Sequence, residues 1–413
     1  MKTMMTTTRS RILVVTAVLL SLFFSTLDEG RVDGAEPLGP EVLLPAWQGA
    51  DAYRPAVAYG DGQYLVAWQA GRVMKGDIVA CRVDAEGKVK DATPVVISAA
   101  ADDQEAPSVA FGQGTFLVVW QDLRGGKDYD TYAARVSPEG KVLDPAGILI
   151  SGGEGNQSSP RVIFDGTSFV VAWEDHRSMK RYEIYAARVS PEGEVLDPEG
   201  VLIASHSWLD RFSPALSVTE KPGEVLVGWN GRIYPGVPGD LAGGVRVAAG
   251  QEVARFVING DSKTSPGDRH SPMRLARDGM GHVMVWRNYV PVGRANPAGN
   301  ANLLHVDAEG VVAKRVTLGS TGITDPDVVW DGEGHVVAWH EQRGKADTVN
   351  HTSPFDAVYL RRLDGVEVVV AGTFDAPARR AHLARGADKV AVVYERHPAG
   401  AEQPIRVGLR LVQ

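Results

Sequence analysis

The feature that most constrains the fold of this chain is a repeat of about fifty residues that runs through nearly all of it. One clear copy, PSVAFGQGTFLVVWQDLRGGKDYDTYAARVSPEGKVLDPAGILIS, spans residues 107–151, and the next copy matches it almost position for position. The copies begin at Pro55, Pro107, Pro160, Pro214, Pro272, Pro326 and Ala381. A chain of like units folds as one repeat domain, so the length of 413 residues does not indicate several domains here.

Each repeat predicts four short β-strands. In the clear copy these are PSVAF, FLVVW, TYAARV and GILIS, which are rich in β-branched and aromatic residues and are separated by turn residues. No helical periodicity competes with them. Four strands per unit indicate propeller blades and not a solenoid of helices. The sequence therefore predicts an all-β fold, a seven-bladed β-propeller of four-stranded antiparallel blades.

The two ends of the chain complement each other. The copy that starts at Ala381 reaches Gln413 without a fourth strand, whereas Glu41–Leu44 resembles a fourth strand that has no first three before it. We predict that this N-terminal strand completes the last blade and closes the ring, because closure removes the exposed edges of an open array. The propeller domain is expected to cover residues 36–413.

Residues 1–35 are predicted to be a signal peptide and leader. Lys2, Arg9 and Arg11 precede the apolar run Ile12–Phe24, which suits the hydrophobic region of a signal peptide and is short for a membrane span. We expect a secreted or periplasmic protein with no stable membrane span after signal removal. An uncleaved anchor is the alternative.

Composition and motifs exclude several partners and cofactors. The net charge of -8 is spread over many turns without a basic run, which disfavours nucleic acid. The single cysteine, Cys81, lies in the strand IVACRV and is expected to be a buried small hydrophobe. No phosphate-binding loop, metalloprotease motif or CxxC pair occurs, so we predict no metal and no cofactor. We expect a monomer.

Two features that recur in the repeats are predicted to be structural. A tryptophan ends the second strand of most copies and is expected to pack as a wedge between neighbouring blades. After this tryptophan comes an acidic residue, and an arginine stands two positions further on. Because the two recur together in several copies, a structural ion pair is favoured over a single catalytic site. The acidic and basic partners are Asp122 with Arg124, Asp175 with Arg177, and Glu341 with Arg343.

Functional residues are expected on one face of the ring. Short Gly turns join the first strand to the second and the third to the fourth on the other face. The face that carries the connections between blades, called here the long-loop face, gains long loops at residues 232–240, 287–300 and 340–355. The candidate ligand-binding residues there are Arg211, Arg269, His270, Arg287, Tyr289, His340, Glu341 and His351.

These candidates have alternative interpretations. Arg211 and Arg269 match Gln104 and Gln157 in position, and can either pair with carboxylates of a ligand or bridge blades. The remaining candidates bind a ligand only if they converge, and otherwise are surface polar residues. His282 and His335 lie within strands and are expected to be core histidines. The sequence leaves two function classes open: a binding protein for a polysaccharide, peptide or protein, and an extracellular polysaccharide lyase or glycoside hydrolase.

The repeat also resembles known proteins. Its pattern, P-x-V-A…L-V-V-W-x-D-x-R…D-x-Y-A-A-R-V, resembles repeats of secreted bacterial β-propeller proteins. It is distantly similar to TolB-type repeats through Arg124 with Tyr132, and through Arg177 with Ile184 and Tyr185. The segment DAYRPAVAYGDGQYLVAW resembles the R-x-P opening of sialidases. The resemblance implies a propeller fold and does not assign an activity.

Overall fold

The computed structural model describes residues 38–71, 75–207, 210–231, 242–258, 273–287, 301–307, 312–318, 323–343, 355–363, 367–372, 377–398 and 403–413. The chain separates into two units, residues 1–35 and Glu36–Gln413, and the described residues belong to the second. Among them, no helix is long and apolar enough to cross a membrane.

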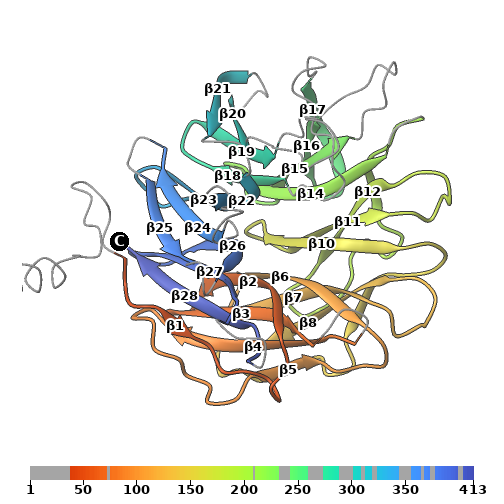
Figure 1. Cartoon of the computed structure of the whole chain (residues 1–413). Helices are drawn as coiled ribbons and strands as arrows, with labels where there is room; N and C mark the ends of the chain where they lie inside the picture. Colours follow the sequence, from red (N-terminus) through yellow and green to blue (C-terminus); the bar gives the residue numbers. More distant parts are fainter. Residues whose placement is uncertain are drawn as a thin grey trace, which may run out of the picture. The chain divides into compact units, whose positions relative to one another are not determined.

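Seven four-stranded antiparallel sheets are arranged as the blades of a β-propeller, as predicted (Figure 1). The first three blades are β2 (Ala52–Gly60), β3 (Gln63–Ala70), β4 (Asp77–Asp84), β5 (Val95–Ser98); β6 (Gln104–Gly112), β7 (Thr115–Asp122), β8 (Asp130–Val136), β9 (Ile148–Ser151); and β10 (Gln157–Phe164), β11 (Phe169–Asp175), β12 (Glu183–Val189), β13 (Val201–Ala204). The next three are β14 (Arg211–Val218), β15 (Glu224–Gly231), β16 (Ala242–Ala248), β17 (Gln251–Ile258); β18 (Arg274–Arg277), β19 (Gly281–Arg287), β20 (Ala301–Asp307), β21 (Val312–Leu318); and β22 (Ile323–Trp330), β23 (His335–Arg343), β24 (Phe355–Arg362), β25 (Glu367–Ala371).

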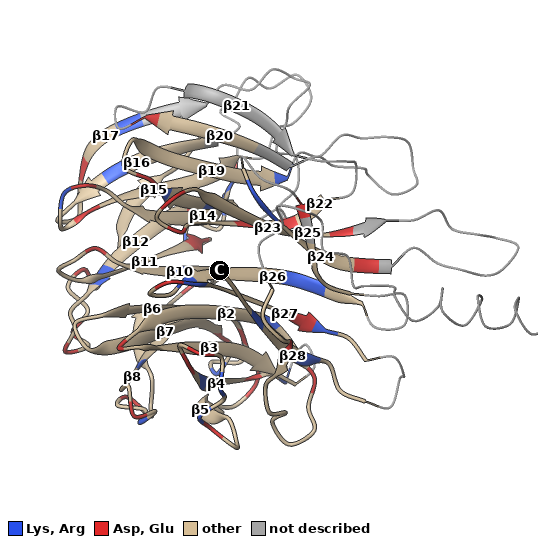
Figure 2. Ribbon diagram, turned by 90° about the vertical axis from the view of Figure 1, so that its left-hand side faces the viewer, with Lys and Arg blue, Asp and Glu red and all other residues tan. Residues whose placement is uncertain are grey.

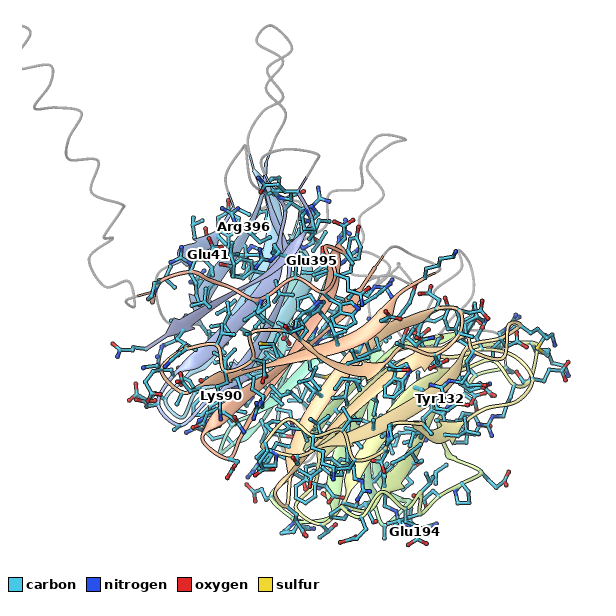
Figure 3. All side chains as sticks on the ribbon, turned by 90° about the horizontal axis from the view of Figure 1, so that it is seen from below. Glu41, Lys90, Tyr132, Glu194, Glu395 and Arg396 are labelled. Atoms are coloured by element: carbon cyan, nitrogen blue, oxygen red, sulfur yellow. The ribbon has the colours of Figure 1, made fainter. Side chains whose placement is uncertain are left out.

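The seventh blade joins the two ends of the propeller. It contains β26 (Ala378–Arg385), β27 (Val390–Arg396), β28 (Arg406–Val412) and, as its fourth strand, β1 (Val42–Leu43). Val42 pairs with Leu409 in the antiparallel register, which confirms the predicted closure. Figure 3 shows Glu41 beside Arg396 on this blade, and the Arg396 Nε lies 3.3 Å from a Glu41 carboxylate oxygen.

The second strand of each blade carries the core. Every residue of β3 is buried, because neighbouring blades cover both faces of the strand. The predicted wedge tryptophans are fully buried, among them Trp68, Trp120, Trp173 and Trp339. The Trp120 Nε1–H donates to Asp122, which also pairs with Arg124 at 2.7 Å. Asp175 repeats both contacts, so the recurrent acid–base pairs of these two blades are structural.

The innermost strands begin earlier than the sequence predicts. β6 starts at Gln104, three residues before Pro107, because a β-bulge separates the two parts of the strand. The pairing register shifts at the corresponding place in the innermost strands of six blades: between Tyr53/Ala56, Glu105/Ser108, Ser158/Arg161, Phe212/Ala215, Thr324/Asp327 and Arg379/His382. A bulge turns one side chain away from its usual direction and bends the strand.

The turns between first and second strands are of two kinds. Asp61 and Gly62 both adopt positive φ, at 51° and 70°, as the two-residue hairpin turn requires. At Asp165 the chain makes a longer turn instead, in which the carboxylate accepts the backbone N–H groups of Thr167 and Ser168. Asp278 and Asp331 accept backbone N–H groups of their own turns in the same way.

Candidate functional site

A polar cavity opens at the centre of the ring on the long-loop face. Its volume is about 530 Å³, and it is lined by residues from the starts of the innermost strands and the ends of the second strands. Figure 2 shows a basic stretch on β26 and an acidic stretch at the end of β27. The described lining residues are Arg54, Ala106, Pro107, Ser159, Arg161, Glu174, Ser213, Pro214, Arg274, Arg287, Thr324, Asp325, His340, Asp356, Arg379, Arg380, Ala381 and His382.

The bulges form the rim of this central pocket. The rim residues of six blades share a positive φ of 45° to 55°, and they are Arg54, Ala106, Ser159, Ser213, Asp325 and Arg380. A left-handed conformation costs a non-glycine residue about 1–2 kcal/mol, so each bulge must be held by other contacts. A β-bulge re-aims a side chain, and bulges are common next to binding sites. The rim residues are therefore candidates for contact with a ligand.

Side chains from the preceding blade hold the bulges in place. In four blades, the residue directly after the wedge tryptophan, or directly after Tyr394 in the last blade, accepts the backbone N–H of the next rim residue. Glu395 accepts from Arg54 at 2.9 Å, and Gln121 accepts from Ser159 at 2.9 Å. Glu174 accepts from Ser213 at 2.9 Å, in the same arrangement. These hydrogen bonds join adjacent blades at the pocket and offset the backbone strain.

His340 occupies this position in the sixth blade. Its Nδ1 accepts the Arg380 N–H at 3.4 Å, so the ring proton lies on Nε2, which is 2.5 Å from the Thr324 hydroxyl oxygen. Burial is the main cause that lowers the pKa of His340, although Asp325 and Asp356 raise it. The neutral imidazole therefore fixes a bulge and at the same time lines the pocket.

A carboxyl group beside the rim titrates near neutral pH. Glu105 is buried and accepts a hydrogen bond from the Arg54 guanidinium at 2.9 Å. Burial, together with the hydrogen bond to Asp103, raises the pKa of Glu105 to about 7, although Arg54 opposes this shift. The Tyr129 hydroxyl donates to Asp103 at 3.2 Å, so the group of acids also has a neutral donor.

Three polar side chains, Arg161, Arg274 and His382, line the floor of the pocket, and the buried Asp327 lies beside them. The Arg274 Nη2 donates to the His382 Nε2 at 3.1 Å, and the opposite ring nitrogen, Nδ1, lies 3.3 Å from a carboxylate oxygen of Asp327. Burial and the nearby arginines hold the pKa of His382 well below its usual value, so the ring is neutral. Burial and Arg274 also lower the pKa of Arg161, the third of these lining residues.

The structure brings together two of the predicted candidates. Arg287 and His340 both line the central pocket. Glu341 is buried away from it and accepts the Trp339 Nε1–H at 3.2 Å, and Arg211 is buried at the start of β14, outside the pocket lining. The other four candidates, Arg269, His270, Tyr289 and His351, lie outside the described residues.

Sequence reasoning missed the residues of the floor. The residue after the starting proline is Ala56 in the first blade and Ser108 in the second, and this position was not singled out from the sequence. A comparison of the copies at this single position would have shown Arg161, Asp327 and His382 as departures from small residues.

The fold and the pocket together define a seven-bladed β-propeller with a polar central pocket on one face. Within the described ranges, no group of three or more His, Cys, Asp or Glu side chains is placed to hold a metal ion. No protein-family model matches the chain, and no curated protein matches it.

Several solved structures are similar to this chain at low identity. A Penicillium chrysogenum alpha-L-arabinanase complexed with arabinobiose is 11% identical with a TM-score of 0.46, covering 90% of this chain and 98% of its own. A thermostable family-43 glycoside hydrolase is 13% identical with a TM-score of 0.40, covering 68% and 96%. A glycosyl hydrolase from Bacteroides ovatus is 11% identical with a TM-score of 0.40, covering 92% of each chain. Likeness at this level carries no conclusion about activity.

Proposed function

We propose that the protein is a secreted β-propeller that binds an acidic polysaccharide in its central pocket. The observation that carries the proposal is the pocket lining, whose described residues include six arginines and three carboxylates together with serine and threonine hydroxyls. Such a lining suits a ligand that is polar over its whole surface and carries negative charge. The volume of about 530 Å³ lies within the range of small-ligand sites, about 300–1,000 Å³.

Catalysis on the polysaccharide is the second candidate function, and the acid near the rim favours it. A carboxyl group with a pKa of about 7, as at Glu105, can act as a general acid or base near neutral pH. Glu105 contacts Arg54, which lines the central pocket together with Arg287 and His340. In that case ligand binding would open the contact between Arg54 and Glu105.

A screen against polysaccharides tests both candidates. The purified chain is applied to acidic and neutral polysaccharides, and both retention and new reducing or unsaturated chain ends are measured. Retention by acidic polymers without new ends supports a binding protein. New ends that disappear in Glu105→Gln support the enzyme. Retention by neutral polysaccharides alone, or by no polymer, contradicts the proposal.

Paired substitutions test the placement of the site. Arg287→Ala with His340→Ala changes two side chains of the central pocket. Lys141→Ala with Glu194→Ala changes the short-turn face, and Figure 3 shows Glu194 well away from Glu395 and Arg396. We expect loss of binding only from the first pair. Equal loss from both pairs, or loss from the second alone, would contradict the placement.

Export from the cytoplasm remains part of the proposal. It is supported by the basic residues before the apolar run Ile12–Phe24. N-terminal sequencing of the extracellular or periplasmic fraction is expected to find a chain that begins near Ala35. Recovery of intact Met1 in the cytosol would exclude export.

A further inference from the structure

The seven blades supply an internal comparison at the floor of the pocket. In each blade, one residue of the innermost strand pairs with the residue just before the wedge tryptophan or tyrosine. The residues at this floor position are Ala56, Ser108, Arg161, Ala215, Arg274, Asp327 and His382. Three blades have alanine or serine at this position, so the fold itself does not require a charged side chain there.

The polar floor residues are therefore unnecessary for the blades and costly in desolvation. Asp327 is fully bonded: it accepts the Val328 N–H at 2.9 Å and the Leu383 N–H at 2.8 Å, besides its contact with His382. The Arg274 Nε lies 3.5 Å from the same carboxylate. One buried carboxylate thus holds one arginine and orients the histidine.

Arg161 is the second guanidinium of the floor, and the negative charges of Asp327 and Glu174 both act on it. Its Nη1 donates to the Pro160 carbonyl at 3.0 Å, and it forms no ion pair with any residue in the described part of the chain. It also lies close enough to Arg274 for the two cations to repel each other. The charges that act on Arg161 are the cations of Arg274 and Arg54 and the carboxylates of Asp327 and Glu174. Three guanidinium groups against two carboxylates leave an incomplete charge balance, which an anion from the cavity would complete.

We propose that Arg161 and Arg274 form an anion subsite that takes the acidic substituent of a sugar, a carboxylate or a sulfate ester. This inference rests on the proposed function for the identity of the ligand. Asp327 and His382 position Arg274, and the neutral His382 ring directs its remaining proton to Asp327 and not to the anion. The rest of the sugar chain would extend toward the rim, where Arg54 and Arg380 lie.

Matched ligands test the subsite. Binding of oligogalacturonate is compared with that of its methyl ester, and a sulfated oligosaccharide is compared with its desulfated form. We expect the charged member of a pair to bind about 10- to 100-fold more tightly to the wild-type chain. Arg161→Gln should abolish the difference, and Arg161→Lys should restore part of it. Stabilisation by inorganic sulfate, measured as a shift in thermal unfolding, should also be lost in Arg161→Gln.

The control is Arg277→Gln, which changes an arginine at the other mouth of the ring, in a second cavity of about 410 Å³. It should leave the charge preference unchanged. Equal binding of charged and uncharged members, or a preference that survives in Arg161→Gln, overturns the subsite and leaves the proposed function standing. Sulfate stabilisation that depends on Arg161 without any saccharide binding supports the subsite and refutes the proposed function. Absence of both responses refutes the two together.

Discussion

Two adjacent leucines of the N-terminal strand test how the ring closes. Leu44 is fully buried beside Val393, Val407 and Leu409 of the last blade, whereas Leu43 is 45% exposed. Leu44→Ala deletes buried methyl groups and leaves a cavity, which typically costs about 2–5 kcal/mol. Leu43→Ala makes the same chemical change at the surface, where substitutions usually stay within about 0.5 kcal/mol.

The assay is denaturant unfolding of the mature chain, followed by tryptophan fluorescence. We expect the unfolding midpoint of Leu44→Ala to fall clearly below that of Leu43→Ala, because only Leu44 anchors the first strand in the core shared by the first and seventh blades. Similar midpoints for the two variants would refute closure through this strand. Deletion of residues 36–50 should be more severe, since it also exposes the edge of β28.

Two further perturbations follow from the packing of the blades. Burial lowers the pKa of His282 to about 4 in the folded state, so stability is lost as pH falls below about 6.5. His282 alone should account for a drop in unfolding free energy of about 2 kcal/mol between pH 7 and 5, so the drop should be smaller by about that amount in His282→Gln, while the other buried histidines keep their share in both proteins. Asp175→Ala should lower the unfolding free energy by about 1–3 kcal/mol, because it leaves the Trp173 Nε1–H unpaired. Arg177→Ala removes the more exposed partner of Asp175 and should cost less. Equal losses for the two variants in chemical denaturation would contradict this.

The repeat was sufficient to predict the fold. Strand order, blade number and closure all follow from copies whose turn residues and apolar runs recur every fifty residues or so. The bulges could not be predicted, because a bulge is a property of the register between two strands and Ala106 or Ser159 carries no local signal of positive φ. Because of these bulges, the innermost strands begin nearer to the long-loop face than the sequence predicts.

The candidate site was predicted only in part. Arg287 and His340 line the pocket, yet His340 also holds a bulge, so its position has a structural reason shared with Gln121. Arg161 was missed because it follows a proline within an apolar strand and resembles an ordinary core position. Arg274 is offset from it by one residue in the repeat, and only the strand pairing shows that the two are equivalent.

A crystal structure of the mature chain with an acidic oligosaccharide tests the proposed site most directly. We expect the sugar in the central pocket, with its acidic group between the guanidinium groups of Arg161 and Arg274. Sugar bound only at the outer edges of the blades, or at the opposite mouth beside Arg277, would contradict the placement of function in this pocket.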